Sequence, residues 1–315
     1  MKVITLTPVK NEAWILPYSL KNFSSFSDHI IIADQQSSDE TINICKTFEK
    51  VRVINNPYTK HTNQIRWLLL DEARKIKGNN LIIYLDADEF LSQETILELK
   101  KISLLYPQGT QFSANWIQLL HSLTTYRVDG VWKKANHKNF AFLDDRKLDY
   151  NRAIITNDHS NRIPDGNTII PLNLPIIHVQ YLAEKKCELK QILYRCNELL
   201  HGRDARRINY RYAVSDFSKK TATENVKPSW ISGIEFPSSE IFDEDDFIKK
   251  EQIYRLFQNK GVLSFEDLDI WNNDEFRQYF IDCIGRPPVS KHYPKIIRVA
   301  NDLKNFIKNA ILKKV

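Results

Sequence analysis

The sequence predicts an α/β protein whose mostly parallel sheet is covered by helices on both faces. In the first 90 residues, short runs of β-branched and other apolar residues alternate with segments of helical spacing. These runs are apolar throughout instead of alternating with polar residues, as expected of strands buried on both faces. From about residue 183 the pattern is mainly helical. We therefore expect a Rossmann-like α/β body followed by a helical extension.

Each element of the first 90 residues has a local signal. Ser37 and Glu40 stand at capping-box spacing, which predicts that a helix begins here and runs through Ile42, Cys45 and Phe48. Gly78 is a stop signal for the long helix before the fourth strand. The expected strands are 3–6, 29–33, 51–54 and 81–85, and the other expected helices are 14–23 and 62–76.

Beyond residue 110 the pattern is less regular. The acidic run 243–246 is suited to cap the helix that follows it. The remaining expectations are an extended segment at 111–119, loop-rich chain with several short extended pieces over 126–175, a strand at 176–179, a helix at 183–200, linker over 216–246 and a helix at 247–259. We divide the chain into a first domain, 1–200, with halves 1–100 and 101–200, and a mainly helical extension, 201–315.

The net charge of +6 is concentrated at one end of the sequence. Residues 291–315 hold seven of the 45 basic residues and one of the 39 acidic residues, which leaves 38 of each sign in 1–290. Apolar residues in this segment recur at three- and four-residue steps, so it reads as a basic amphipathic helix. It is a candidate contact with an anionic membrane surface, and the alternative is a helix docked on the protein with its lysines in solvent.

Composition excludes several classes of protein. Hydrophobic residues make up 42% and charged residues 27%, as in ordinary globular chains. No run approaches the roughly 18 apolar residues of a membrane helix, and no signal-peptide core is present, so we expect a cytoplasmic protein. The neutral body argues against a nucleic-acid partner. Four widely spaced cysteines predict buried free thiols and no disulfides or zinc site: Cys45, Cys187, Cys196 and Cys283.

Polar loops follow three of the first four strands. These loops are residues 7–12 (TPVKNE), 34–41 (DQQSSDET) and 86–89 (DADE). Ligands of parallel sheets bind at the carboxyl ends of the strands, where such loops meet. Asp86 and Asp88 together suit Mg²⁺ or Mn²⁺, which would leave coordination positions open for substrate phosphates.

These three motifs, in this order and spacing, resemble family 2 glycosyltransferases, which have the GT-A nucleotide-sugar-binding fold. The first loop resembles the family's nucleotide-binding loop, the second its D-x-x-S-x-D-x-T segment, and the third its metal-binding D-x-D. The resemblance is good over 1–100 and looser over 101–200. Similarity to bacterial members implies a role in surface polysaccharide synthesis, such as lipopolysaccharide or capsule.

The resemblance implies roles for individual residues. It places Asp34 at the base of the nucleotide, Arg66 at the diphosphate, and Asp86 near ribose and metal, with Lys190 and Arg195 as weaker diphosphate candidates. The implied nucleotide-sugar contacts are Pro8, Asn11, Glu12, Asp34, Arg66, Asp86 and Ala87, and the implied metal ligands are Asp88, Asp86 and His178. The alternatives are structural: a strand end at Pro8 and Asn11, a turn at Asp34, a solvated Arg66 and a core His178.

An inverting transfer needs a general base, for which a carboxylate is the usual choice. The family's usual Glu-Asp dipeptide is absent from the expected region. Asp158 is our first candidate, followed by Asp165 and Asp145, with Asp129 and Asp144 as further carboxylates of that region.

The sequence thus predicts a metal-dependent inverting glycosyltransferase that moves a sugar from a nucleotide-sugar, which we expect to be a UDP-sugar, to a glycan or lipid-linked acceptor. One alternative is a nucleotidyltransferase, whose first loop is usually rich in glycine, unlike residues 7–12. The other is a binding module of the same fold that lacks activity, against which the intact D-x-D argues.

Overall fold

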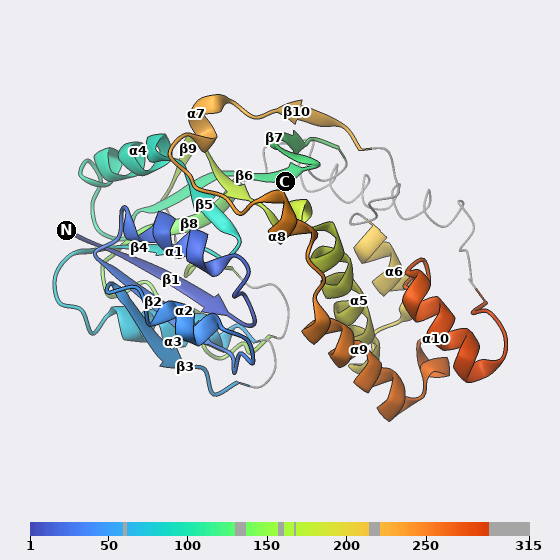
Figure 1. Ribbon diagram of the computed structural model, residues 1–315. Coiled ribbons are helices and arrows are strands. Elements are labelled where there is room, and N and C mark those ends of the chain that lie inside the picture. Colours follow the sequence, from blue (N-terminus) through green and yellow to red (C-terminus); the bar gives the residue numbers. More distant parts are fainter. Residues whose placement is uncertain (59–61, 130–136, 157–160, 167, 214–220, 290–315) are drawn as a thin grey trace, which may run out of the picture. The chain divides into compact units, whose positions relative to one another are not determined.

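The computed structural model describes the chain except for residues 59–61, 130–136, 157–160, 167, 214–220 and 290–315 (Figure 1). The strands are β1 (Lys2–Val9), β2 (His29–Asp34), β3 (Val51–Asn55), β4 (Asn80–Tyr84), β5 (Glu89–Leu91), β6 (Gln111–Leu120), β7 (Ser122–Arg127), β8 (His137–Asp144), β9 (Ile169–His178) and β10 (Thr223–Asn225). The helices are α1 (Leu16–Ser24), α2 (Thr41–Cys45), α3 (Gln64–Ala73), α4 (Gln93–Ser103), η2 (Gln180–Leu182), α5 (Glu184–Leu200), α6 (Ala205–Tyr212), α7 (Pro228–Ile231), α8 (Ser239–Asp243), α9 (Phe247–Lys260), η4 (Val262–Phe265) and α10 (Asp274–Ile284). The basic segment 291–315 and its two alternative roles lie outside the described residues.

Two compact units divide the described chain. The first contains Met1–Ala183 and returns with Thr221–Asp243, and the second contains the described residues within Glu184–Lys220 and Glu244–Val315. Helix α5, which we assigned by sequence to the first domain, belongs to the second unit. The reason is its apolar side, where Leu189 and Ile192 share a core with Ile253 and Phe257.

The first unit contains a single sheet that confirms the predicted fold class. Its main path runs β10-β7-β6-β8-β4-β1-β2-β3, and β9 joins it by pairing with β5 and β6 (Figure 1). Strands β1 to β4 are mutually parallel where they pair, and β8 is antiparallel to β4. The mostly parallel part therefore lies at the N-terminal end of the chain, as the alternating pattern indicates.

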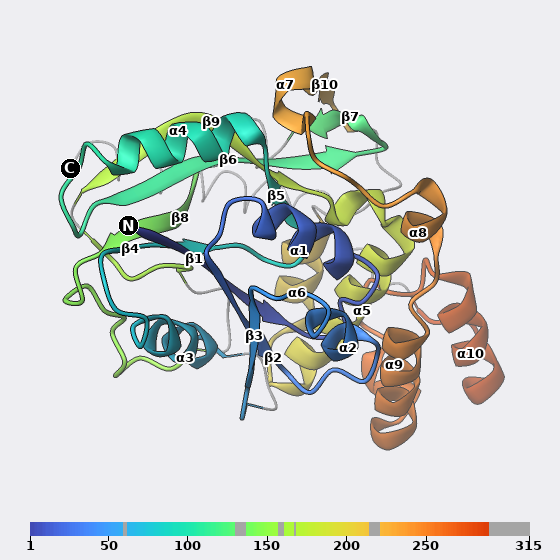
Figure 2. The same cartoon turned by 60° about the vertical axis from the view of Figure 1, so that its left-hand side comes forward.

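Both faces of this parallel part are covered by helices, as predicted. Alternate residues of β1 enter two different cores: Val3 packs with Phe23 of α1, and Ile4 packs with Leu69 of α3. Figure 2 shows α1 and α3 on either side of β1. The central strand β4 is buried along its whole length, which explains why its sequence is apolar without alternation.

Three local expectations were wrong. The capping box fails, because α2 begins at Thr41 with no side-chain cap, while Ser37 accepts a hydrogen bond from the first loop instead. Strand β9 begins at Ile169, earlier than the strand expected at 176–179, because Pro171 and Pro175 lie within it and proline is unusual inside a strand. Cys283 is exposed, whereas the three other cysteines are buried free thiols as expected.

The second unit is helical, as predicted for the C-terminal part. Its core is rich in aromatic side chains, with Phe257 at the centre, packed against Trp271 and Phe276. The acidic run caps α9 as expected, because Asp246 accepts a hydrogen bond from the amide of Lys249 at 2.9 Å. Within the described residues, no helix combines the length and the hydrophobicity that crossing a membrane requires.

Candidate functional site

The three polar loops lie at one edge of the sheet. In the parallel registers, Val9 of β1 is opposite Asp34 of β2, and Leu6 of β1 is opposite Tyr84 of β4. Strands β1 and β2 therefore end level with each other, and β4 ends beside them, opposite a residue near the end of β1. The chain that follows them, with Asn11, the segment after Asp34 and Asp86, leaves the sheet on the same side.

The first two loops are bound to each other by hydrogen bonds. The amide of Asn11 donates to Ser37 Oγ at 2.9 Å, and the amide of Ser38 donates to Asn11 Oδ1 at 2.8 Å. Asn11 has a φ of 55°, in the left-handed region that asparagine tolerates better than most residues. The amide of Glu12 also donates to Thr41 Oγ1 at 2.9 Å. These bonds hold the two loops as one structure at the strand ends.

The remaining residues predicted for these two loops have partly structural contacts. Pro8 lies within β1 opposite Ala33. The carboxylate of Glu12 accepts a hydrogen bond from Trp14 Nε1 at 3.0 Å. Asp34 is half-buried and accepts from the amide of Ser37 at 3.2 Å, an Asx-type turn that leaves part of its carboxylate accessible.

Asp86 lies between two arginines. Arg162 donates from Nη2 to Asp86 Oδ2 at 2.8 Å, and Nη2 of Arg66 is 3.8 Å from Oδ1. Burial favours the protonated form of Asp86, but the charges of Arg162 and Arg66 outweigh it and hold the pKa of this carboxyl below its usual range. The side chain of Asp86 is 37% exposed, so it remains accessible to a ligand.

The guanidinium of Arg66 uses only part of its hydrogen-bonding capacity in the described structure. Its guanidinium lies over the ring of Tyr84, with the carbon 5.8 Å from the ring centroid, and its side chain is 12% exposed. Its Nη1 is buried without a hydrogen-bond partner among the described residues. A buried guanidinium nitrogen that lacks an acceptor is suited to receive one from a ligand.

Asp88 and His178 form the second part of the site. Both are buried, and His178 Nε2 is 3.2 Å from Asp88 Oδ2. The imidazole is stacked on Trp116, with ring centroids 4.9 Å apart, and its Nδ1 is hydrogen-bonded to Gln118 Oε1. Ala87, between the two aspartates, is buried in the core under α1.

Strand register explains why these side chains meet. His178 of β9 is opposite both Glu89 of β5 and Gln118 of β6, so the three project from the same face of the sheet. Trp116 lies two residues from Gln118 and shares that face. Lys138 of β8 places its Nζ 4.5 Å from the centroid of the Trp116 ring. Burial and then the charge of Arg162 lower the pKa of this lysine.

The donor set fits a divalent cation shared with a substrate. Asp88 and His178 offer an oxygen and a nitrogen 3.2 Å apart, and Asp86 is two residues away. Within the described residues, no group of three or more histidine, cysteine, aspartate or glutamate side chains could hold a metal. Mg²⁺ commonly takes one or two carboxylates and completes its shell with water and substrate phosphates, so two or three protein ligands suffice.

The carboxylates that we considered as the general base differ in their positions and partners. Asp158 lies outside the described residues. Asp165 is exposed and accepts a hydrogen bond from Asn161 at 2.6 Å. Asp129 pairs with Arg127. Asp144 is opposite Asn80, where β4 begins, so Asp144 and the adjacent Asp145 lie at the sheet edge opposite to Asp86 and are not brought to the site.

The two weaker diphosphate candidates belong to the second unit. Lys190 and Arg195 are both on α5, and Arg195 donates from Nη2 to the carbonyl oxygen of Tyr212 at 3.2 Å.

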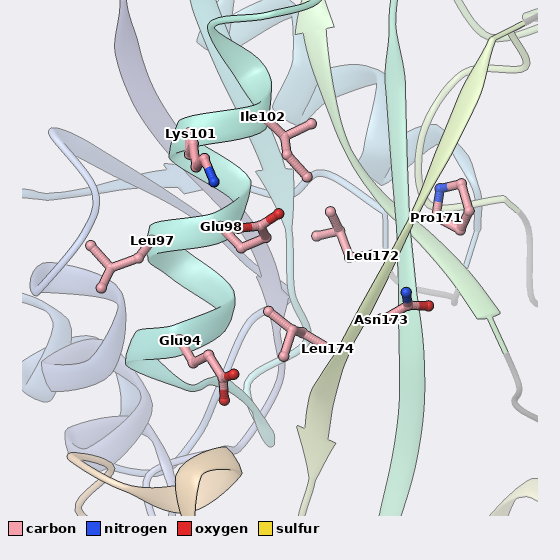
Figure 3. Close-up of a pocket in the computed structure, with 9 residues that line it drawn as sticks. All are labelled: Glu94, Leu97, Glu98, Lys101, Ile102, Pro171, Leu172, Asn173 and Leu174. Atoms are coloured by element: carbon pink, nitrogen blue, oxygen red, sulfur yellow. The ribbon is translucent and has the colours of Figure 1, made fainter.

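One surface hollow of the first unit lies away from the predicted site residues. It has a volume of about 460 Å³ and lies between α4 and β9 (Figure 3). The side chains around it include Leu97 and Glu98 of the helix and Leu172 of the strand, and none of the predicted site residues lines it.

Sequence reasoning missed the residues that surround the two aspartates. Arg162 bonds to Asp86 and to Glu89, and Glu89 also accepts from Trp116 Nε1 at 2.5 Å. Glu89 directly follows the D-x-D, which was a usable signal. Arg162, Trp116, Gln118 and Lys138 carried none, because only pairing of distant strands and loops brings them to Asp86 and Asp88.

Comparisons with known proteins agree with the motifs. Residues 5–102 match the model of glycosyl transferase family 2. An uncharacterized glycosyltransferase of Rickettsia prowazekii, RP128, is 29% identical over 119 residues, which is 38% of this chain and 38% of that relative. A second uncharacterized glycosyltransferase, RT0209 of Rickettsia typhi, matches equally well. The chain thus spans about two fifths of the length of the curated relatives it matches.

Solved structures with related arrangements are more distant. TarS of S. aureus in complex with UDP has 11% identity and a TM-score of 0.43, covering 61% of this chain and 66% of that one. Glucosyl-3-phosphoglycerate synthase of Mycobacterium tuberculosis, in complex with Mn²⁺, UDP and glucosyl-3-phosphoglycerate, has 16% identity and a TM-score of 0.29, covering 38% and 44%. The match to glycosyl transferase family 2 thus covers residues 5–102, which contain the parallel part of the sheet and its three loops.

Proposed function

We propose that this chain is a metal-dependent, inverting glycosyltransferase that uses a nucleotide-sugar donor, with uracil as the preferred base. The observation that carries the proposal is the position of Asp86 and Asp88. They follow β4 at the edge where the loops of β1 and β2 also end, inside the region that matches the family. Asp34 at this edge would contact the base, and Asn11 and Glu12 would support the nucleotide loop.

The chemistry follows from the charges. A nucleoside diphosphate leaves with two or more negative charges, and a bound Mn²⁺ or Mg²⁺ would offset them as a Lewis acid. Asp88 and His178 would hold that ion, with Asp86 beside them. Arg66 would add a guanidinium N–H to a phosphate oxygen, because its Nη1 has no acceptor in the described part of the chain. The residues near the site thus supply positive charge where the leaving group develops negative charge.

The reaction also needs a base and an acceptor. An inverting transfer needs a carboxylate that removes the proton of the acceptor hydroxyl, and Asp158 remains our candidate, with Asp165 next. We propose a glycan or lipid-linked acceptor of bacterial surface polysaccharide synthesis, such as lipopolysaccharide or capsule. Segment 291–315, through its seven basic residues, would place a cytoplasmic enzyme at an anionic membrane surface.

Calorimetry with UDP, with and without Mn²⁺, tests the proposal. We expect UDP to bind in the presence of Mn²⁺ and to lose most of its affinity when EDTA removes the metal. Asp88→Asn should abolish the metal-dependent part and the turnover of UDP-sugars, while the circular dichroism spectrum stays unchanged. Equal binding of UDP by both proteins, with or without metal, contradicts the metal role. Absence of any nucleotide binding contradicts the transferase and favours an inactive module.

A further inference from the structure

Three contacts fix the imidazole of His178. Its Nδ1 is hydrogen-bonded to Gln118 Oε1, its Nε2 is 3.2 Å from Asp88 Oδ2, and its ring is stacked on Trp116 with an interplanar angle of 25°. All four residues come from two neighbouring strands and the loop before β5, and His178 itself is 5% exposed. The ring therefore has one orientation, and its two nitrogens have different neighbours.

The contact with Gln118 determines where the ring proton lies. In this structure the amide oxygen of Gln118 faces Nδ1, and because an amide oxygen accepts hydrogen bonds and cannot donate them, Nδ1 is the ring nitrogen that carries the proton in this arrangement. Nε2 then faces Asp88 with a lone pair when the ring is neutral. A ring nitrogen and a carboxylate oxygen that face the same point are a donor pair for a cation. Metal-binding histidines are commonly oriented in this way, through a hydrogen bond from the nitrogen that does not bind the metal.

Packing alone does not account for a glutamine at this position. Gln118 is 1% exposed, and its Nε2 has no hydrogen-bond partner among the described residues. A buried amide with an unsatisfied donor destabilises a fold, and an apolar side chain of similar shape fills the same space without that cost. The contact that distinguishes Gln118 from such a side chain is its bond to His178.

We propose that Gln118 is a positioning residue for the metal site. It keeps the proton of His178 on Nδ1 and directs Nε2, together with Asp88, toward a divalent cation that is shared with the donor diphosphate. This inference rests on the proposed metal-dependent function. It assigns to Gln118 a role in metal affinity and none in contact with the nucleotide or the acceptor.

Binding of Mn²⁺ in the presence of saturating UDP, followed by electron paramagnetic resonance of the free ion, is the first measurement. Gln118→Met removes the acceptor and keeps the shape, and its Mn²⁺ affinity should fall about 10- to 100-fold. Gln118→Glu keeps an acceptor for Nδ1 and should retain the affinity. Gln191→Met is the matched control, since it removes a side-chain amide with an unsatisfied oxygen from the second unit, and it should leave the affinity unchanged.

A double-mutant cycle separates positioning from general damage. In a His178→Ala background, Gln118→Met should cause no further loss of Mn²⁺ affinity, because its effect passes through the ring. The thermal unfolding midpoint of Gln118→Met should equal or exceed that of the wild type. The inference is overturned if Gln118→Met lowers the unfolding midpoint and also lowers the Mn²⁺ affinity equally in the wild-type and His178→Ala backgrounds. That result would assign Gln118 a merely structural role.

The second measurement needs no metal. Nitrogen-15 NMR of the imidazoles at alkaline pH, with His178 assigned by its substitution, reports which nitrogen carries the proton. We expect the proton of His178 on Nδ1 in the wild type and in Gln118→Glu, and its shift to Nε2 in Gln118→Met. A proton on Nε2 in the wild type, or no change in Gln118→Met, overturns the inference. If UDP and Mn²⁺ fail to bind the wild type, the proposed metal dependence fails instead, and the NMR result still decides the role of Gln118.

Discussion

Arg162 and Glu89 form two parallel hydrogen bonds, with Nη1 2.6 Å from Oε2 and Nη2 2.6 Å from Oε1. Glu89 is fully buried, and the side chain of Arg162 is 10% exposed. The same arginine reaches Asp86, and its guanidinium lies over Trp116, 5.7 Å from the ring centroid. A loop residue far along the chain thus fixes the segment that carries both aspartates of the proposed metal site.

Arg162→Met should therefore destabilise the first unit strongly. It leaves Glu89 buried without its cation, and breaking a buried pair in this way costs about 3–5 kcal/mol. Urea unfolding should show that loss, and the double variant Arg162→Met, Glu89→Leu should recover much of it. The control is Arg255→Met on α9, whose partner Glu251 is as exposed as Arg255 itself, and it should cost less than about 1 kcal/mol. If Arg162→Met and Arg255→Met lower the free energy of unfolding by similar amounts, the pair of Arg162 and Glu89 does not stabilise the fold more than an exposed ion pair does.

Asn11 should matter for its backbone as well as for its side chain. Asn11→Ala removes the acceptor of the Ser38 amide and keeps the left-handed φ, which costs a non-glycine residue about 1–2 kcal/mol. Asn11→Gly removes the same acceptor without that strain. We expect the alanine variant to lower both the unfolding midpoint and the UDP affinity more than the glycine variant does. The reverse order in calorimetry and thermal unfolding contradicts the role of φ.

The elements that sequence predicted correctly are those with a strong local signal. The buried strand β4 and the amphipathic helix α3 depend on their own apolar pattern, so their existence could be read from residues 62–85 alone. Strand β9 could not, because its prolines hide it and its partner β6 supplies the pairing. Ser37 shows why a local rule can fail. Its hydroxyl oxygen, which a capping box would use for the start of the helix, accepts a hydrogen bond from the amide of Asn11, 26 residues away.

The site divides in the same way. Asp86 and Asp88 were predicted because a strand and its following loop are contiguous in sequence. Arg162, Trp116 and Gln118 act through pairings that no short motif encodes, and their partners are fixed by the register of β5, β6 and β9. The physical reason is that a sheet gathers side chains by register across strands, whereas a motif records only neighbours along the chain.

Asp34 should act on the base and not on the phosphates. In Asp34→Ala the carboxylate that would accept from the base is lost, and a charge-assisted hydrogen bond of this kind contributes about 1.5–3 kcal/mol, or roughly 10- to 100-fold in affinity. UDP affinity should fall by that factor, whereas Mn²⁺-dependent affinity for pyrophosphate should not change. Calorimetry with both probes makes the comparison. If Asp34→Ala loses affinity for UDP and for pyrophosphate equally, Asp34 does not contact the base.

Arg66 should show the opposite pattern, because its unsatisfied Nη1 would meet a phosphate oxygen. Arg66→Met should weaken UDP and pyrophosphate alike, by about 10- to 100-fold, and Arg66→Lys should restore part of the loss, since lysine keeps the charge without the planar fork.

The matched control for Arg66 is Arg74, which follows the same helix, α3, and pairs with Asp144 at the opposite edge of the sheet. Arg74→Met should lower the unfolding midpoint, because it leaves a buried carboxylate unpaired, yet the folded protein should bind UDP as the wild type does. For Arg66→Met we expect the converse, weak binding with little loss of stability, because no full-strength partner among the described residues is lost. If both variants lose UDP affinity in proportion to their stability, the effect of Arg66 passes through the fold and not through a contact with the diphosphate.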